Sequence, residues 1–449
     1  MKSFMIFLFL YHATLLAQTP QWTLLRENTS GVIAVDPTNS NIIYIDGVLK
    51  TTDGGLTWQF NSLGFGVIPN DIIVDPNDLK MVYVCGNGLR MGIVKSADGG
   101  LTWTKSDTGI VTDHHGYSVL AMALDAKRNI LYAGDVAASG GVYRSLNGGK
   151  YWERLPMARF EARDLLVDQE NGTVYAGTFN GVWKSPEQGR TWVRISKGLP
   201  INSINPFSGD TLYYDVWSIA KVKQSNTLYA VLRENGIYKS FDAGKNWFSV
   251  NNELSTGITF HRVVVSEVDT NIIYVGGQSN RFAGIMAGLL RSTNGGQIWQ
   301  RYAEGLPTTS PEWLWALHLT MHKNALYLEL QGLVPRGIYK LEPAAMTSVK
   351  NDREIKIKTY NLVPNYPNPF INSTWISYQL KDNSFAKIKI FDITGKEVIT
   401  LVEKQQTGGE YKTQWNGKNR EGGDVPSGIY FVQLKAGSFI KTHKMVLMR

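Results

Sequence analysis

The chain has very little cysteine: Cys85 is the single cysteine among 449 residues. An internal disulfide is therefore excluded, because a bridge needs two thiols. Cys85 ends the apolar run Met81–Cys85, which predicts a buried core thiol rather than a reactive one. The low cysteine count does not argue against secretion, because exported bacterial proteins without disulfides are common.

Long hydrophobic segments are missing beyond the first residues of the chain. The apolar run from Phe4 to Leu16 follows Met1-Lys2-Ser3 and is too short to span a bilayer. Its length and flanks are typical of a secretory signal peptide, so we expect residues 1–17 to be removed by cleavage after Ala17. No later run is long enough to cross a membrane, and no transmembrane segment is predicted.

An excess of positive charge is confined to the two ends of the sequence. The formal net charge of the chain is +8. From Lys350 onward there are 16 Lys and Arg against 9 Asp and Glu, whereas residues 3–349 hold 29 of each sign. The central region is therefore neutral, and we predict no nucleic-acid partner. The lysines of the tail are scattered along expected strands, as on a solvated sheet face.

Motifs for several common chemistries are absent from the sequence. It contains no Gly-rich phosphate loop, no nucleophile elbow and no zinc-ligand spacing. Two histidine pairs occur, His114-His115 and His318-x-x-x-His322. Adjacent residues of a strand point to opposite faces, and residues four apart are separated by more than about 10 Å. We therefore predict no metal site and no cofactor.

One eight-residue motif, Ser/Thr-x-Asp/Asn-x-Gly-x-x-Trp, occurs six times, with Glu187 in the acidic position of the fourth copy. Each copy joins two short apolar runs and is expected to form a hairpin connection. The acidic or amide side chain can accept backbone N–H groups, the glycine allows a positive φ, and the tryptophan can bury its ring between neighbouring sheets. The motif residues are Asp53, Gly55, Trp58, Asp98, Gly100, Trp103, Asn147, Gly149, Trp152, Gly189, Trp192, Asp242, Gly244, Trp247, Asn294, Gly296 and Trp299.

This motif resembles the Asp-box of bacterial-neuraminidase-type repeats, which occurs in sialidases, sortilin-like receptors, xyloglucanases and photosystem II assembly factors. The resemblance implies a β-propeller. It leaves the activity open, because these relatives perform unrelated functions on one fold. A residue repeated in every unit normally serves the unit, so we predict a structural and not a catalytic role for the boxes.

Units of about 40 to 55 residues repeat from Trp22 to about Pro343, the spacing of propeller blades. The last unit ends at Gly337–Leu341 without a box, and the first run, Trp22–Arg26, has no blade of its own. If this run docks as the fourth strand of the last blade, the ring closes. We predict an all-β fold with a seven-bladed propeller over residues 18–343. A six-bladed ring with an irregular extra sheet is the alternative.

The composition changes after the propeller. Residues 344–360 are polar and charged, which indicates a linker. Residues 361–449 contain short runs with alternating polarity, separated by turns such as Thr394-Gly395-Lys396 and Gly408-Gly409. This pattern predicts a small immunoglobulin-like β-sandwich.

This last region resembles the C-terminal sorting domain of type IX secretion cargo. The pieces that carry the resemblance are Tyr366–Phe370, Asp392–Val398, Pro426–Tyr430 and Lys444–Arg449. It implies export through the type IX secretion machinery of a Gram-negative bacterium, to the medium or the outer cell surface. By analogy the sorting signal comprises Gly428, Tyr430, Lys444 and Met445. Gly428 also suits a tight turn and Tyr430 a sandwich core, so a purely structural role stays open.

Candidate functional residues lie in the loops expected at the end of the propeller opposite to the boxes. Asp71, Asp164, Asp215 and Glu312 stand at or next to the starts of inner strands. Two carboxyl groups about 6.5–9.5 Å apart would suit an inverting glycosidase. They could also hold a cation, or simply cap strand ends. Aromatic residues in the same loops suit sugar or peptide binding, or loop packing: Phe160, Tyr213, Tyr214, Trp217 and Trp313.

Two functions are compatible with these features. The first is a secreted or cell-surface binding protein, without catalysis, for a glycan, peptide or protein. The second is a sialidase-like or xyloglucanase-like glycoside hydrolase. The sialidase resemblance lacks its Arg-Ile-Pro signature and a third arginine beside Arg163 and Arg262, and xyloglucanases usually pair two propellers. We therefore expect a binding role. A third reading, assistance in assembling another complex, rests on analogy with the photosystem factors.

Overall fold

The computed structural model describes residues 22–64, 67–88, 92–111, 116–136, 140–157, 161–206, 208–251, 254, 258–278, 288–302, 306, 315–323, 325–331, 335–342, 360–362, 365, 368, 370 and 372–448. These residues form strands and turns, and none of them is helical, which confirms the predicted all-β class. The chain divides into two compact units, Met1–Ser348 and Val349–Arg449. The predicted signal peptide and nearly all of the predicted linker lie outside the described residues.

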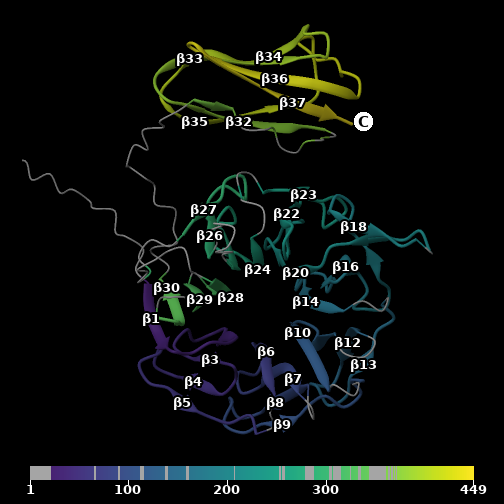
Figure 1. Ribbon diagram of the computed structural model, residues 1–449, viewed down its shortest axis with the longest axis vertical. Helices are drawn as coiled ribbons and strands as arrows, with labels where there is room; N and C mark the ends of the chain where they lie inside the picture. Colours follow the sequence, from purple (N-terminus) through teal and green to yellow (C-terminus); the bar gives the residue numbers. More distant parts are fainter. Residues whose placement is uncertain are drawn as a thin grey trace, which may run out of the picture. The chain divides into compact units, whose positions relative to one another are not determined.

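In the first unit, antiparallel pairing joins consecutive strands into groups of four (Figure 1). The first three groups are β2 (Ile33–Val35), β3 (Ile43–Ile45), β4 (Leu49–Thr51) and β5 (Gln59–Phe60); β6 (Ile68–Val74), β7 (Val82–Gly88), β8 (Ile93–Ser96) and β9 (Thr104–Lys105); and β10 (Tyr117–Asp125), β11 (Ile130–Asp135), β12 (Gly141–Ser145) and β13 (Glu153–Arg154). The next three are β14 (Ala162–Val167), β15 (Val174–Thr178), β16 (Gly181–Ser185) and β17 (Val193–Arg194); β20 (Val216–Lys221), β21 (Leu228–Leu232), β22 (Gly236–Ser240) and β23 (Phe248–Ser249); and β24 (Thr259–Val265), β25 (Ile273–Gln278), β26 (Leu289–Ser292) and β27 (Gln300–Arg301).

The last group combines the two ends of the first unit. It contains β28 (Trp315–His322), β29 (Ala325–Gln331), β30 (Gly337–Leu341) and β1 (Trp22–Glu27). β1 pairs with β30 from Trp22↔Leu341 to Glu27↔Gly337, which confirms the predicted docking of the first run on the last blade. The first strands of neighbouring groups contact one another in the order β2, β6, β10, β14, β20, β24, β28 and back to β2. We interpret these groups as the seven predicted blades.

The Asp-boxes form the turns between the third and fourth strands of their groups. In the first box, Thr57 N donates to Asp53 Oδ1 at 2.9 Å, and Gly55 N donates to Thr51 Oγ1 at 3.0 Å. Hydrogen bonds from Thr57 and Thr51 lower the pKa of Asp53 to about 2. The glycine at the fifth position has a φ between +75° and +100° in all six boxes, so its predicted left-handed conformation is confirmed.

The box tryptophans connect neighbouring blades. Trp152 Nε1 donates to the carbonyl of Ser106, which follows the fourth strand of the preceding blade, at 2.6 Å. Equivalent bonds to the preceding blade are made from Trp58 to Leu25, from Trp247 to Ile195 and from Trp299 to Val250. The box therefore closes its own turn and also anchors the outer edge of the preceding sheet.

The second unit consists of two antiparallel sheets, as predicted for a β-sandwich. One holds β31 (Asn361–Leu362), β32 (Thr374–Leu380) and β35 (Gly409–Trp415); the other, in spatial order, holds β34 (Glu397–Gln406), β33 (Ser384–Phe391), β36 (Gly428–Ala436) and β37 (Phe439–Leu447). Their inner faces share one core, in which Trp415 is fully buried and lies 5.4 Å from Phe370 and 5.1 Å from Tyr430, between ring centroids. Alternating polarity along β33 produces this core, because alternate side chains face one side of a sheet.

Two of the sequence pieces that resemble a sorting signal pair with each other in this sandwich. β36 pairs with β37 along their whole length, so Tyr430 lies opposite Met445 and both side chains are buried. Phe370 N donates to the Val446 carbonyl at 2.9 Å, which joins Phe370 to the terminal strand. Lys444 is exposed. Recognition of Gly428, Tyr430, Lys444 and Met445 by a secretion machine stays a prediction.

Candidate functional site

The inner strands share an irregularity near their starts. In β6, β10, β14, β20, β24 and β28 the pairing with the next strand skips one residue, which is the signature of a β-bulge. The extra residues are Asn70, Leu120, Arg163, Trp217, His261 and one residue within Leu317–His318. A bulge turns its side chain away from the regular alternation, so the same device displays a different side chain in each blade.

The residues that follow the bulges join neighbouring inner strands. Asp71 Oδ2 accepts the N–H of Met122 on β10 at 3.0 Å, and Asp71 Oδ1 accepts the N–H of Ile72 at 2.9 Å. Asp164 Oδ2 accepts the N–H of Ile219 on β20 at 2.7 Å. Two of the four candidate carboxylates are therefore bound to the backbone of the ring and link one inner strand to the next.

Arg262 brings these two carboxyl groups together electrostatically. Its Nη1 lies 3.3 Å from Asp164 Oδ1, and its positive charge also acts on Asp71. Burial raises the pKa of both carboxyl groups, and the guanidinium opposes this rise. The result is a charge network that spans β6, β14 and β24.

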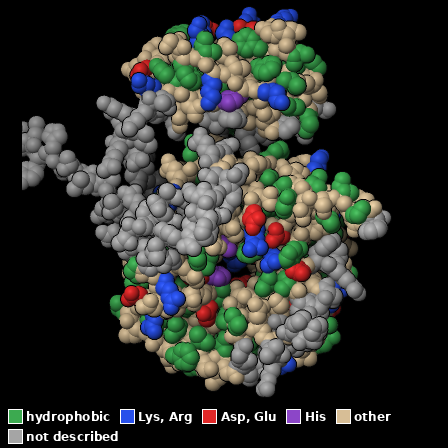
Figure 2. All heavy atoms as spheres, in the orientation of Figure 1, with side chains coloured by type: hydrophobic (Ala, Val, Ile, Leu, Met, Phe, Trp, Pro, Cys, Tyr) green, Lys and Arg blue, Asp and Glu red, His purple; other side chains and the backbone are tan. Residues whose placement is uncertain are grey.

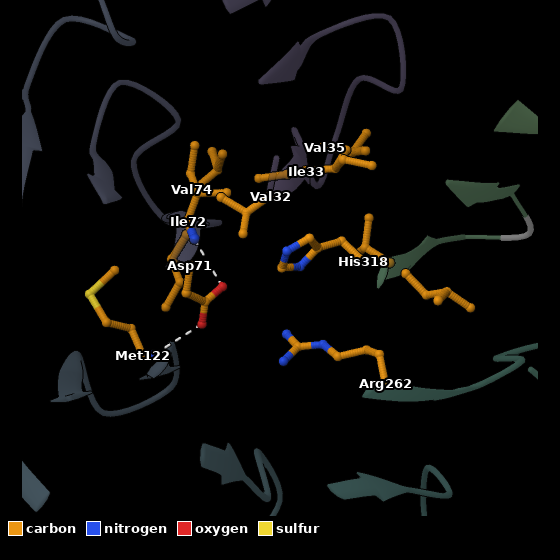
Figure 3. A pocket seen from close by; sticks show the side chains of 13 residues that line it. Val32, Ile33, Val35, Asp71, Ile72, Val74, Met122, Arg262 and His318 are labelled. Carbon is orange, nitrogen blue, oxygen red and sulfur yellow. Dashed lines mark hydrogen bonds between the residues drawn. The ribbon is translucent and has the colours of Figure 1, made fainter. Parts of the chain in front are cut away.

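A cavity of about 300 Å³ lies beside this network and is surrounded by the inner strands β2, β6, β10, β24 and β28. Figure 3 shows Asp71, Arg262 and His318 pointing toward one another across it, with apolar side chains such as Ile72 and Val74 along the wall. Figure 2 shows a hollow in the propeller with histidine and charged side chains around it. The polar groups of the inner strands therefore face a space that a small ligand can occupy.

The third predicted carboxylate, Asp215, belongs to a separate cluster at the bulges of β14 and β20. Asp215 Oδ2 accepts a hydrogen bond from Trp217 Nε1 at 2.6 Å and lies 3.9 Å from Arg163 Nε. The guanidinium carbons of Arg163 and Arg233 each lie 4.9 Å from the centroid of the Trp217 ring. His261 meets the same ring edge-on at 5.4 Å. We call Arg163, Asp215, Trp217, Arg233 and His261 the rim cluster.

The remaining predicted ligand residues have other surroundings. Tyr213 and Tyr214 are half-buried and pack against the core between the fourth and fifth blades. Tyr213 lies on β19 (Thr211–Tyr213), which forms a hairpin with β18 (Ile201–Ile204), and Arg194 stacks on its ring at 5.2 Å. Glu312, Phe160 and Trp313 lie outside the described residues. Sugar or peptide binding by any of these aromatic residues stays a prediction.

A second carboxyl pair was not anticipated from the sequence. Asp46 Oδ1 accepts the N–H of Val32 at 2.9 Å, and Glu329 is bound by the adjacent N–H of Gly31. Glu329 also lies 3.6 Å from His318 Nε2, measured from its Oε2. Burial raises the pKa of Asp46 to about 6 and that of Glu329 to about 7, and it lowers the pKa of His318 to about 3. The sequence did contain a sign of this pair, because Glu329 is an acidic residue inside the apolar run Leu326–Leu330.

Groups of metal-ligating side chains and helices of membrane-spanning length are both absent from the part of the chain that the structure describes. No three His, Cys, Asp or Glu side chains are grouped there as a metal ion would need. His318 and His322 both lie on β28, whereas the His114-His115 pair is not described. No helix of membrane-spanning length and hydrophobicity is present among the described residues.

Comparison with known proteins identifies the C-terminal unit. Residues 365–448 match the family model described as "Secretion system C-terminal sorting domain". The chain is similar to a xyloglucanase of Hypocrea jecorina, at 28% identity over 238 residues that make up 48% of this chain and 24% of that protein. A xyloglucanase of Acetivibrio thermocellus is 26% identical over 290 residues, 53% of this chain and 34% of its own length. The chain thus spans about a quarter to a third of these curated relatives.

The solved structure of a xyloglucanase from Xanthomonas campestris confirms the fold. It superimposes with a TM-score of 0.54 at 15% identity and covers 73% of this chain and 54% of its own. At this identity the likeness establishes the β-propeller and no activity. Together with the sorting domain, it shows a propeller that is exported by type IX secretion to the medium or outer surface of a Gram-negative bacterium.

Proposed function

We propose that this exported propeller is a non-catalytic protein that binds an extracellular glycan at the mouth of its ring. One observation carries the proposal. The two carboxylates best placed for catalysis, Asp71 and Asp164, accept backbone N–H groups of neighbouring inner strands and share the charge of Arg262. Groups engaged in this way hold the ring together and are poorly suited to exchange protons with a substrate.

A glycan is the preferred ligand class for two reasons. The chain is similar to proteins named xyloglucanases over about half of its length, and polysaccharides are what an exported surface protein encounters. The rim cluster combines an aromatic ring with two guanidinium groups and a carboxylate, which can pack on and hydrogen-bond sugar hydroxyls. Glycan binding needs such groups but no acid–base pair.

A hydrolase is the second candidate, and the similarity to xyloglucanases favours it. An inverting glycosidase needs a protonated carboxylic acid and a carboxylate base on either side of the bond. Asp46 and Glu329, with pKa values of about 6 and 7, are carboxyl groups whose partners Val32 and His318 line the cavity. Glu329 is only 2% exposed, however, which argues against its contact with a polymer.

The test uses the purified full-length secreted protein on a panel of neutral polysaccharides that includes xyloglucan. Binding is measured by affinity electrophoresis, and released reducing ends are measured over time. We expect retardation without release of reducing ends, and loss of retardation in Trp217→Ala. Tyr151→Ala, which removes an aromatic side chain from the box end of a blade, is the matched control and should bind normally.

Release of reducing ends that Asp46→Asn and Glu329→Gln abolish would replace the proposal by the hydrolase. Absence of both binding and release over the whole panel would contradict both glycan functions.

A further inference from the structure

The cavity beside Arg262 is lined by residues other than those of the rim cluster. Its volume of about 300 Å³ lies at the lower end of small-molecule sites, which span about 300–1,000 Å³. A space of this size suits one small ligand or a single sugar ring and is too small for a chain of sugars. It is bounded by residues of five inner strands, β2, β6, β10, β24 and β28.

Polar groups in the cavity retain hydrogen-bonding capacity. Arg262 has five N–H donors, and its one ion-pair contact among the described residues is Nη1 to Asp164; about a third of its side chain is exposed toward the cavity. Each oxygen of Asp71 accepts one backbone N–H and can accept a further bond. His318, 39% exposed, and Thr320 complete the polar lining. Donors and acceptors therefore converge on one small volume.

The charges of the cavity balance in a way that disfavours an acidic ligand. The Arg262 guanidinium is paired with Asp164 and lies in the field of Asp71, so no unpaired positive charge remains for a carboxylate or phosphate. Burial lowers the pKa of His318 to about 3, so its imidazole is neutral at physiological pH and adds no cation. A neutral ligand with several hydroxyl groups meets no such conflict, because each hydroxyl both donates and accepts.

The other lining residues present little apolar surface to the cavity. Ile72, Val74 and Met122 are only 6%, 7% and 4% exposed. A pyranose ring carries hydroxyl groups around its rim, so a single sugar can satisfy Arg262, Asp71 and His318 together.

We propose that the cavity binds the terminal sugar of a neutral glycan, so that the propeller recognises chain ends and not internal segments. This inference rests on the proposed glycan binding. It adds where the terminal sugar binds and that chain ends are preferred to internal segments. The terminal ring occupies the space between Asp71, Arg262 and His318, and the following sugars pass the rim cluster on their way out.

The experiment is a calorimetric titration of the full-length protein with xyloglucan polymer, with xyloglucan oligosaccharides and with free glucose, xylose and galactose. Recognition of ends predicts saturation at one chain end per protein, whatever the length of the chain. At least one free monosaccharide should bind at millimolar concentration, because a ligand of this size has few contacts.

Variants locate the binding in the cavity. His318→Leu and Thr320→Val should each weaken the monosaccharide and oligosaccharide affinity about three- to tenfold, the effect of one lost hydrogen bond. His322→Leu makes the same change on the same strand outside the cavity lining and should bind like the wild type. Equal melting temperatures of Thr320→Val and wild type exclude a folding defect as the cause.

The outcomes separate the two proposals. Polymer binding that depends on mass and not on chain ends, with unchanged affinity in His318→Leu and Thr320→Val, would overturn end recognition and leave glycan binding at the rim intact. Failure of the wild type to bind any saccharide would overturn both.

Discussion

The two ends of the propeller blades use repetition in different ways. At the box end, the same side chains make the same bonds: Ser145 accepts the N–H of Gly149 just as Ser240 accepts that of Gly244. At the mouth, six inner strands repeat the same backbone bulge but fill it with different residues, such as Arg163, Trp217 and His261. A repeated side chain serves the unit, whereas a repeated backbone device with varied side chains builds one asymmetric site.

Replacing tryptophans at the two ends gives the largest expected contrast. Trp152→Ala should lower the free energy of unfolding by about 4 kcal/mol, because a fully buried ring and its bond to Ser106 are lost. Trp217→Ala, at a half-exposed bulge, should cost about 1–2 kcal/mol. Urea denaturation measures both. Equal losses would contradict the division between a structural box end and a variable mouth.

The charged groups of the mouth divide in the same manner. Asp164→Ala should cost about 3 kcal/mol, because it leaves Arg262 without its ion pair and the buried Ile219 N–H without its acceptor. Asp215→Ala should cost about 1 kcal/mol, since it removes the bond from Trp217 Nε1, whereas Arg163 is 3.9 Å away and both charged side chains reach solvent. The free energies of unfolding of the two variants are measured in parallel by urea denaturation. A larger loss for Asp215→Ala would assign the structural role to the rim cluster.

The seam between the first and last blades should make stability depend on pH. Because the pKa values of Glu329 and Asp46 are raised, the folded state holds protons between about pH 4 and 7 that the unfolded chain has released. The contribution of these two groups to the free energy of unfolding therefore falls as the pH rises through this window. The lowered pKa values of His318 and His261 act oppositely below about pH 6.5.

Glu329→Gln isolates the first effect. The difference in free energy of unfolding between this variant and the wild type should shift in favour of the variant by on the order of 2 kcal/mol from pH 5 to pH 8. The wild type loses stability over this range as Glu329 releases its proton, whereas the amide has no proton to lose. Unfolding at both pH values, with Glu342→Gln as an exposed control, provides the measurement. An identical pH dependence of variant and wild type would show that Glu329 ionises normally.

The smallest effect concerns the one irregular box. Glu187 receives a single 3.3 Å bond from Thr191 Oγ1, whereas Asp53 accepts bonds from Thr51 Oγ1, Thr57 N and Thr57 Oγ1. Glu187→Asp should therefore stabilise the protein by about 0.5–1 kcal/mol, through the regained backbone bond. Thermal unfolding measures it, with Glu170→Asp on an exposed turn as the control. A loss of stability would show that the fourth box has adapted to the longer side chain.

Sequence reasoning performed well where a residue's role depends on its neighbours in the chain. The six boxes, the pairing of Trp22–Arg26 with the last blade and the sorting domain were all readable, because local turn chemistry and alternation encode them. Cys85 is fully buried, as its apolar run predicted. The predicted boundaries at residues 17, 343 and 360, and the sorting-signal residues, stay predictions.

The site was harder to anticipate, because its members come from strands far apart in the sequence. Asp71 and Asp164 were correctly placed near inner-strand starts, but nothing local indicates that Met122 and Ile219 bind them. Arg262 stood out only as an arginine near the mouth. Glu329 was overlooked, although an acid in the middle of an apolar strand is a signal of a buried polar contact.

The sequence by itself determined the repeat, the ring closure and the export domain, since each follows from short-range hydrogen bonding, hydrophobic alternation or a contiguous motif. Only the tertiary structure decided that Asp71, Arg262 and His318 face one cavity, and that two apparent catalytic acids serve as links between strands. The physical reason is that bulges in separate blades converge at the centre of a closed ring, and that convergence depends on contacts between residues up to two hundred and more positions apart.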